Sequence, residues 1–349
     1  MRTLISALLV FPVTYLIYVY PAFVLGHLLV GSAIHQLSSV LLAAGLSVLI
    51  FVYLRTHLST ALVRGLTHYG MGFGFLGFCV FNLGLLAATI WPEARFETGL
   101  VAALAFGLLS GFSLYQGRVI QTKSLVFESG KVTRPVSLIF ISDVHLGSTP
   151  KRHLENLCAV ISQYDYDMLL IGGDLFDSSA FQTKDLSAFL GIDRPIYFVT
   201  GNHEYYVRDH RHKLEELNRF NISVLDNQTA AIGPVNLIGI SDNQSPDQQV
   251  AQARAGVQKD SFNLLAVHKP TIWDRISGEV DLMVSGHTHN GQIFPFNLVV
   301  RLQFRTVYGL FRTATSALYV SSGSGTWGPR MRLGTQNEVV KIDIRPPAR

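Results

Sequence analysis

The sequence predicts an all-α region of about four transmembrane helices followed by an α/β domain with mixed sheets. Hydrophobic residues make up 48% of the 349 residues and charged residues only 15%, whereas ordinary soluble domains carry nearer a quarter charged residues. Nearly all of this imbalance lies before residue 117, and after it short apolar strands alternate with amphipathic helices. We therefore expect a transmembrane region over 1–117, a connecting hairpin or linker over 118–134 and a second domain over 135–349.

The first region contains four long apolar runs without Asp, Glu, Lys or Arg: Leu4–Val30, Ser38–Leu54, Gly70–Trp91 and Gly99–Tyr115. The length of each run approaches or exceeds about 20 residues, which is the length of a helix that crosses a hydrocarbon core. The first run lacks the small-residue cleavage site of a signal peptide. Four such runs in series do not fit inside a soluble fold, so the sequence indicates a multi-pass membrane protein.

Cationic residues flank these runs unevenly. Arg2 precedes the first run, Arg55 and Arg64 lie between the second and third, and Arg118 and Lys123 follow the fourth. Because Lys and Arg are enriched on the cytoplasmic side of membrane proteins, we expect the second domain to lie in the cytoplasm. The predicted location is the inner (plasma) membrane.

The elements of the second region follow from their patterns. The stretch "KSLVFESGKVTRPVSLIFISD" alternates, turns at Ser129-Gly130 and enters an apolar run at Val136–Ile141. This predicts a hairpin or a short pair of strands, and then a buried strand. Helical spacing follows in "HLENLCAVISQY", "TKDLSAFLGI" and "HKLEELNRFNI". Short apolar strands are expected at "YDMLLIGGD", "PIYFVTGNH", "VNLIGISD", "NLLAVHKP", "DLMVSGHTH" and "ALYVSSGSG".

Residues that can bind metal stand at the ends of five of these strands, in "SDVHLG", "GGDLFD", "GNHE", "AVHKP" and "GHTH". Taken singly, each has a structural explanation such as a helix cap or a turn. Ligands in open α/β sheets, however, gather beyond the carboxyl ends of strands. Imidazoles and carboxylates suit Mn, Fe or Zn, and a shared carboxylate lets two cations lie close together. In extended chain, the side chains of a D-x-H or H-x-H pair point the same way.

In this order the motifs D-x-H, G-D, G-N-H-E, H and G-H-x-H resemble the calcineurin-like metallophosphoesterase family, from about Ser137 to the end of the chain. The resemblance implies a β-sandwich flanked by helices and two divalent metal ions, Mn or alternatively Fe, Zn or Mg. It implies one metal held by Asp143, His145 and His289, with Asp174 bridging to a second held by Asn202, His268 and His287. His203 would contact the scissile phosphate and protonate the leaving oxygen, a role that suits a side chain titrating near neutrality.

A narrower resemblance involves "GHTHNGQIFPF" and the late "SSGSGTWGPRMRLG". Both are similar to the membrane-associated bacterial branch that includes some UDP-2,3-diacylglucosamine hydrolases. That branch usually has Gly where Asn290 stands, a change that leaves the ligands untouched. The Gly-rich "SSGSGTWG" follows the last strands and is interpreted as a turn, not as a phosphate cradle.

The stretch "QIFPFNLVVRLQFRTVYGLFRT" mixes apolar residues with arginines and contains no acid. It is either a loop and a strand packed on the domain with solvated arginines, or a lip that contacts membrane lipids and a lipid-linked substrate through Phe294, Phe296, Arg301 and Arg305. The second interpretation predicts a phosphodiesterase or pyrophosphohydrolase acting on a UDP-diacylglucosamine or a phospholipid.

An alternative function is a membrane-coupled phosphodiesterase that acts on a soluble nucleotide as part of a transport or sensing protein. Ionisable residues inside the apolar runs would favour it, but only His27 lies inside one. No nucleic-acid partner is expected, because the basic residues are spread along the membrane flanks. The sequence leaves the oligomeric state open.

Overall fold

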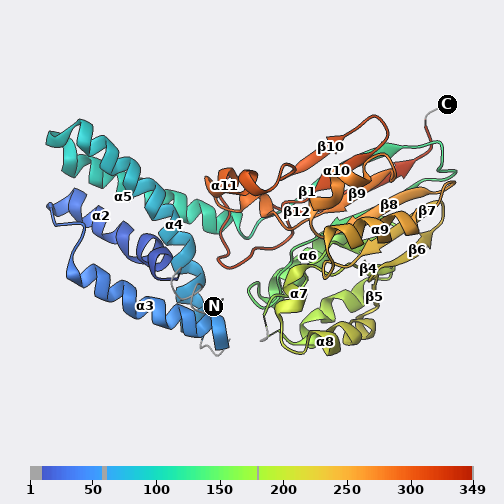
Figure 1. The fold of residues 1–349 in the computed structure, drawn as a ribbon, viewed down its shortest axis with the longest axis horizontal. Helices are drawn as coiled ribbons and strands as arrows, with labels where there is room; N and C mark the ends of the chain where they lie inside the picture. The colour runs from blue at the N-terminus through green and yellow to red at the C-terminus, as the bar shows by residue number, and fades with distance from the viewer. Residues whose placement is uncertain (1–9, 57–60, 179–180, 348–349) are drawn as a thin grey trace. The chain divides into compact units, whose positions relative to one another are not determined.

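The chain forms two compact units, Met1–Tyr115 and Gln116–Arg349 (Figure 1). The computed structural model describes residues 10–56, 61–178 and 181–347.

Apolar helices make up the N-terminal unit. A π-helical turn (Tyr15–Val19) leads into α2 (Tyr20–Val30), followed by α3 (Leu37–Thr56), α4 (Ala61–Ile90), a 3-10 turn (Pro92–Ala94) and α5 (Arg95–Gln116). Within the described residues, three segments are long and apolar enough to cross a membrane, namely Val10–Val30, Leu62–Ile90 and Pro92–Gln116, while the apolar part of α3, Leu37–Tyr53, is shorter. The described parts of all four predicted runs are thus mainly helical, and three of them have full span length; residues 4–9 of the first run lie outside the described residues.

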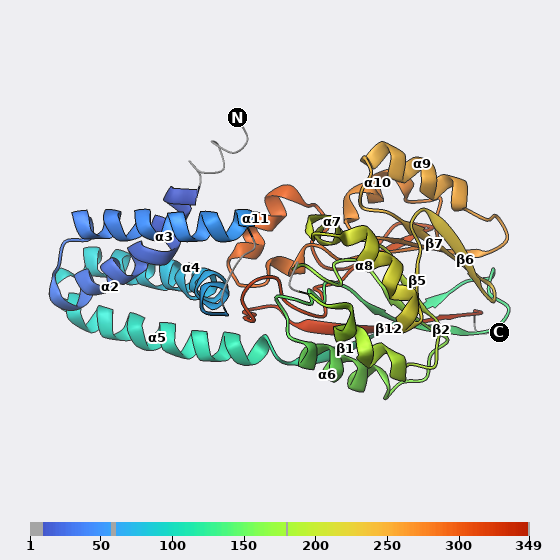
Figure 2. The same ribbon diagram turned by 90° about the horizontal axis from the view of Figure 1, so that it is seen from below.

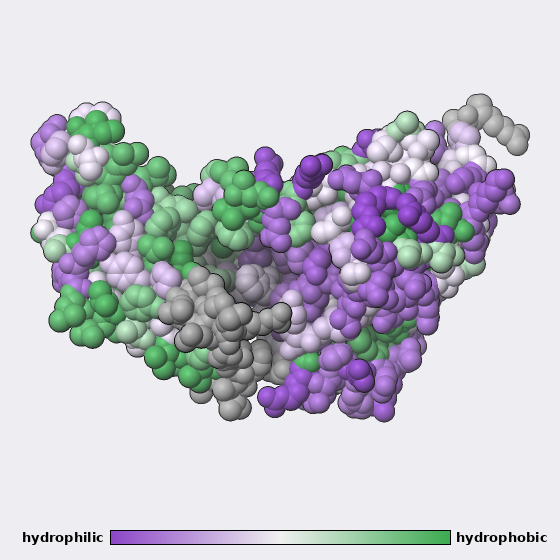
Figure 3. Space-filling model, in the orientation of Figure 1, coloured by the Kyte–Doolittle hydropathy of each residue, from purple (hydrophilic) through white to green (hydrophobic). Residues whose placement is uncertain are grey.

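The apolar side chains of this unit mostly face outward. Between 22% and 28% of the most apolar stretch of each long helix is buried, far less than in a helix hidden inside a soluble fold. Hydrophobic residues accordingly dominate the face of this unit seen in Figure 3, whereas hydrophilic residues dominate that of the C-terminal unit. This distribution fits helices whose surroundings are lipid.

Gly74 lets α4 pack closely against the π-helical turn that precedes α2. Pro21 has no N–H to donate to the carbonyl of Ile17, four residues earlier, and the π-helical turn directly precedes this proline. A Cβ at Gly74 would clash with the same carbonyl oxygen. A glycine of "GMGFGFLGF" therefore permits close helix packing here.

Two six-stranded mixed sheets form the C-terminal unit in the part of the chain that is described, with the strand orders β1-β12-β2-β3-β4-β5 and β10-β11-β9-β8-β7-β6. The strands are β1 (Ile120–Glu128), β2 (Val136–Ile141), β3 (Met168–Ile171), β4 (Ile196–Phe198), β5 (Ile222–Val224), β6 (Gln228–Ile232), β7 (Val235–Ile240), β8 (Phe262–Val267), β9 (Leu282–Ser285), β10 (Gly309–Arg312), β11 (Ala317–Val320) and β12 (Asn337–Arg345). β2 to β5 run parallel to one another, and so do β7, β8, β9 and β11.

Helices lie between and beside these strands: α6 (Lys151–Ile161), α7 (Asn202–Tyr206), α8 (His210–Glu216), α9 (Pro246–Gly256), α10 (Trp273–Ile276) and α11 (Phe296–Gln303). Shorter 3-10 segments occur at Thr183–Gly191, Leu217–Phe220, Pro270–Ile272 and His289–Gly291.

The sheets pack face to face because their central strands are apolar on both sides. Alternate residues of a strand point to opposite faces. Leu138 and Phe140 of β2 therefore join Leu264 of the second sheet in the core between the sheets, while Ile139 and Ile141 pack outward into the core that includes α6. Helices α9 and α10 cover the outer face of the second sheet (Figure 2). The predicted sandwich flanked by helices is confirmed.

Two local expectations were wrong. β1 and β2 do not form a hairpin, because β12 lies between them, parallel to β1 and antiparallel to β2. The interval 118–134 thus supplies a strand of the first sheet, and local alternation cannot show that its partner is the last strand of the chain. The stretch 292–312 contains a strand, β10, but helix α11 takes the place of much of the expected loop.

Candidate metal centre

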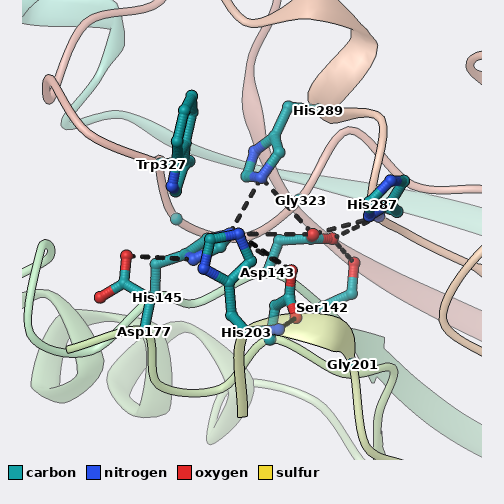
Figure 4. A network of polar contacts seen from close by, with 12 residues as sticks. Ser142, Asp143, His145, Asp177, Gly201, His203, His287, His289, Gly323 and Trp327 are labelled. Carbon is teal, nitrogen blue, oxygen red and sulfur yellow. Dashed lines mark hydrogen bonds and ion pairs between the residues drawn. The ribbon is translucent and has the colours of Figure 1, made fainter. Parts of the chain in front are cut away.

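The residues predicted at the strand ends converge on one site. β2 leads to Asp143 and His145, β3 to Asp174, β4 to Asn202 and His203, β8 to His268, and β9 to His287 and His289. Figure 4 shows four of these imidazoles gathered around Asp143. Parallel strands in both sheets direct their carboxyl ends toward this point, so residues far apart in sequence become neighbours.

Left-handed backbone conformations orient most of these side chains toward the site. Five of the predicted ligands have φ between 50° and 73°: Asp143, His145, Asp174, His287 and His289. Such angles are uncommon for residues other than glycine and cost on the order of 1–3 kcal/mol each. The expectation that the D-x-H and H-x-H pairs lie in extended chain was therefore wrong. Hydrogen bonds between loops hold two of the turns, with the N–H of Asp143 donating to Gly173 and that of His145 to Asp174.

Asn290 is also left-handed, with φ 51°. Asparagine tolerates this region better than most side chains do. The tight turn of "GHTHNG" therefore forms without a glycine at this position.

Asp143, His145 and His289 form one group of ligand atoms. The Nε2 atoms of His145 and His289 lie 3.0 Å apart. Oδ1 of Asp143 lies 3.5 Å from Nε2 of His289 and 3.9 Å from Nε2 of His145. Three lone-pair donors directed at one another from buried positions fit a divalent cation between them.

Asp174, His268 and His287 form a second group of ligand atoms, for which Asn202 is the fourth predicted ligand. Nε2 of His268 lies 3.0 Å from Oδ2 of Asp174 and 3.3 Å from Nδ1 of His287. The buried Oδ1 of Asn202 has no hydrogen-bond partner among the described residues. A buried amide oxygen without a donor is costly, and coordination to a cation would satisfy it.

Asp174 links the two groups. Its Oδ2 is 3.0 Å from His268 and 3.9 Å from Nε2 of His145, which belongs to the first group. Burial alone would raise the pKa of Asp174, but the charge and hydrogen bond of His268 hold it well below its usual value. Burial would likewise lower the pKa of His268, and Asp174 raises it to about 10 instead. A cation bound between them would take the place of this proton.

Comparisons with known proteins identify the domain that carries these residues. Residues 136–291 match the family model described as calcineurin-like phosphoesterase. The chain contains a calcineurin-like metallophosphoesterase domain. An uncharacterized metallophosphoesterase of Helicobacter pylori is 33% identical over 234 residues, covering 62% of this chain and 61% of the relative. A Campylobacter jejuni metallophosphoesterase is 29% identical over 269 residues, covering 70% of each chain.

A Bos taurus protein named transmembrane protein with metallophosphoesterase domain is 31% identical over 235 residues, covering 60% of this chain and 53% of the relative. The chain thus spans about three fifths of the Helicobacter relative and about half of the bovine one. The apolar helices and this transmembrane relative together indicate membrane association. The family and the His/Asp cluster indicate a site for two divalent ions.

Residues around the metallophosphoesterase site orient its ligands. These surrounding residues were not predicted from the sequence. Oδ2 of Asp177 lies 3.2 Å from Nδ1 of His145, and the carbonyl of Gly172 lies 2.8 Å from Nδ1 of His268. Such partners fix the imidazole tautomer and leave the opposite nitrogen free for metal. The second Asp of "GGDLFD" was the available signal for Asp177.

Glu204, the last residue of "GNHE", organises the backbone beneath the site. Its carboxylate is fully buried and accepts the N–H groups of Asp174 at 3.0 Å, Gly201 at 2.7 Å and Phe176 at 3.1 Å. Burial raises the pKa of Glu204 to about 8, and nearby Asp174 adds to the effect. The glutamate therefore joins the loops after β3 and β4, which carry Asp174 and Asn202.

His203 belongs to the site but borders its opening. Its ring lies 4.8 Å from that of His145, its Nε2 is 4.0 Å from Oδ2 of Asp174, and 18% of its side chain is exposed. Burial lowers its pKa to about 4, and His145 adds to the effect. The imidazole is thus neutral at neutral pH, in contrast to the expected titration near neutrality.

The four predicted substrate contacts lie on or beside α11. Phe294 and Phe296 are 51% and 45% exposed, and Arg301 and Arg305 are exposed as well. Arg305 lies 3.8 Å from a carboxylate oxygen of Asp274. Just after α11, the ring of Phe304 lies 5.4 Å from that of His287, so this segment borders the second ligand group.

The late Gly-rich loop packs against the first ligand loop, in keeping with its interpretation as a turn. The N–H groups of Ser324 and Gly325 donate to the carbonyls of Ser142 and Asp143. A Cβ at Gly325 would clash with the carbonyl of Val144. The glycine is therefore needed for close approach to the backbone, and these N–H groups are engaged by protein.

Proposed function

We propose that this protein is a membrane-anchored, dinuclear metal-dependent phosphoester hydrolase, a phosphodiesterase or pyrophosphohydrolase that acts on a lipid-linked phosphate. The observation that carries the proposal is the pair of ligand groups that share Asp174, with His203 beside them. Mn is the proposed metal, since imidazole, carboxylate and amide oxygen form a mixed ligand set.

The residues of the chain have separate roles in this reaction. When bound, two divalent ions supply Lewis acidity toward the phosphoryl oxygens and acidify water. Asp174 keeps the two ligand groups together, and Asp177 holds His145 in the tautomer that leaves Nε2 free. His203 lies where it can reach a phosphoryl group at the opening of the site. A phosphoryl anion beside it would raise its pKa, which favours a proton on the imidazole for the leaving oxygen.

Turnover of a panel of phosphoester substrates tests this function. Detergent-purified protein loaded with Mn is expected to hydrolyse bis-p-nitrophenyl phosphate and at least one UDP-linked lipid or phospholipid. Nucleotides are included, because preference for them over every lipid would favour the alternative function in sensing or transport. Lack of turnover on the whole panel by protein shown to hold two metals would contradict the hydrolase function.

Exposed apolar residues beside the site support a lipid substrate. Leu298, Val299 and Leu302 of α11 are 53%, 52% and 87% exposed, close in sequence to Phe294 and Phe296. Arg301 lies on the same short helix. An apolar stretch with arginines and no acid of its own is suited to an anionic lipid surface and to an acyl chain.

Introduction of negative charge on this surface distinguishes a lipid substrate from a small one. Phe294→Asp with Phe296→Asp is expected to impair hydrolysis of the lipid in mixed micelles and to leave a small chromogenic diester nearly unaffected. Leu190→Asp is the matched control, because Leu190 is equally exposed at 52% but lies on a 3-10 segment outside the site. Equal losses on both substrates would contradict the proposed lip.

The Lys and Arg residues that flank the apolar helices support a plasma-membrane protein whose catalytic domain lies in the cytoplasm. Arg118 lies just after α5 and Lys123 lies within β1, and cations on this side of the last apolar helix favour the cytoplasm. Reporters at the carboxy terminus and within 55–69 are expected on the cytoplasmic side, and reporters within 31–37 on the opposite side. An external carboxy terminus would contradict the assignment.

A further inference from the structure

Two exposed aromatic side chains flank His203 outside the ligand set. The ring of Trp327 lies 6.1 Å from that of His203, and the ring of Tyr206 lies 5.4 Å from it. Trp327 is 47% exposed and Tyr206 65% exposed. Figure 4 shows the Trp327 indole standing over His203 and His145. Large exposed rings beside a catalytic group are candidates for contact with substrate.

The loop that carries Trp327 is held in place from two sides. The side chain of Gln292 accepts the backbone N–H of Trp327 at 3.0 Å and donates to its carbonyl at 3.0 Å. Arg332, which is fully buried, donates to the carbonyls of Ser322 and Gly325 at 2.6 and 2.7 Å. The indole is therefore presented from a fixed backbone, so little entropy would be lost when a ligand binds.

We propose that Trp327 and Tyr206 form a subsite for a flat ring carried by the leaving group of the phosphoester, with Gln292 as a positioning residue. This inference rests on the proposed function, since it places the leaving oxygen at His203. The group attached to that oxygen then lies beside the two rings. An aromatic ring or nucleobase can stack on an indole face, whereas an acyl chain needs only apolar area.

Two phosphonates that differ only in the ring provide the test. Binding of phenylphosphonate and methylphosphonate to the Mn-loaded full-length protein in detergent is measured by calorimetry. The wild-type protein is expected to prefer the phenyl compound by between about five- and a hundredfold, the range for stacking on an aromatic side chain. Trp327→Phe should keep most of this preference. Trp327→Leu, which keeps apolar bulk without a flat face, should bring the ratio near one.

A ratio near one in the wild-type protein would overturn the proposal, and so would an unchanged ratio in Trp327→Leu. Gln292→Ala is expected to lower the ratio while metal content and methylphosphonate affinity stay at the wild-type level. Equal weakening of both phosphonates in this variant would overturn the positioning role. Lack of turnover of bis-p-nitrophenyl phosphate would contradict the hydrolase function without altering the phosphonate ratio, so the two failures are distinguishable.

Discussion

Asp177→Asn is expected to weaken metal binding at Asp143, His145 and His289 and to spare the other group. In the wild-type protein Oδ2 of Asp177 faces Nδ1 of His145 at 3.2 Å, and Oδ1 accepts the N–H of Ser148 at 3.0 Å. With a proton on Nδ1, the nitrogen that lies beside the carboxylate, His145 would present the lone pair of Nε2 to a metal.

An amide of the same shape cannot make both contacts and also leave Nε2 of His145 free for metal. If its oxygen faces His145, its NH2 group opposes the N–H of Ser148. If its oxygen faces Ser148, the NH2 group donates to Nδ1 and moves the imidazole proton to Nε2, where it blocks coordination. The first orientation sets a donor against a donor in a buried place, and the second removes the Nε2 lone pair that would bind metal.

Loss of such an orienting partner lowers metal affinity by about 10- to 100-fold, or about 1.4–2.7 kcal/mol. The upper half of this range applies here, because the side chains of His145 and Asp177 are 0% and 2% exposed and water has little room to replace the lost contact. The hydrogen bonds and ion pairs among the described residues join Asp177 to His145 and Ser148 and not to the second group, so the affinity of the second site should change little.

Competition titration with a chelator measures both affinities, and circular dichroism checks the fold. The expected result is one weakened and one unchanged site, with two metals still bound at saturation. Asp193→Asn is the matched control, since it removes the same charge from an exposed position. Wild-type affinity at both sites would refute the reasoning about the tautomer. Equal weakening of both sites in a folded variant would refute the assignment of Asp177 to one group.

Four further outcomes are expected. Asp174→Ala should lose both metals and turnover while the circular dichroism spectrum is kept, and a variant that retains both metals would remove Asp174 from the centre. His203→Ala should keep two metals and lose about 10²–10⁴-fold in kcat, with smaller losses on esters that have very good leaving groups; loss of metal would make His203 a ligand. Glu204→Gln should lower the free energy of unfolding by about 1–3 kcal/mol, because its NH2 group would oppose one of three backbone donors; an unchanged denaturation midpoint would contradict this. Burial lowers the pKa of His153 to about 4, so as the pH falls the imidazole is protonated in the unfolded chain before it is protonated in the folded protein. The folded protein therefore loses about 3 kcal/mol of its free energy of unfolding as the pH falls from about 6.5 to about 4. Thermal unfolding of His153→Gln should depend less on pH over this interval than that of the wild-type protein.

The sequence alone was sufficient for the fold class and for the candidate ligands. Apolar runs near the thickness of a membrane are recognisable without any contact between them. Strand ends are also local features, and parallel strands bring their carboxyl ends together whatever the loops do. The order of Asp, His and Asn after five strands therefore pointed to one site before any distance was known.

Tertiary structure decided how that site is built. The insertion of β12 between β1 and β2 depends on contacts across most of the chain, which local alternation cannot report. The left-handed turns at Asp143 and His145 exist because neighbouring loops accept their N–H groups. Asp177 and Glu204 stand in the motifs "GGDLFD" and "GNHE", but their roles, like that of Trp327, follow only from the atoms beside them. The pKa of His203 likewise depends on burial against His145, since desolvation is a property of the packed site and not of the residue.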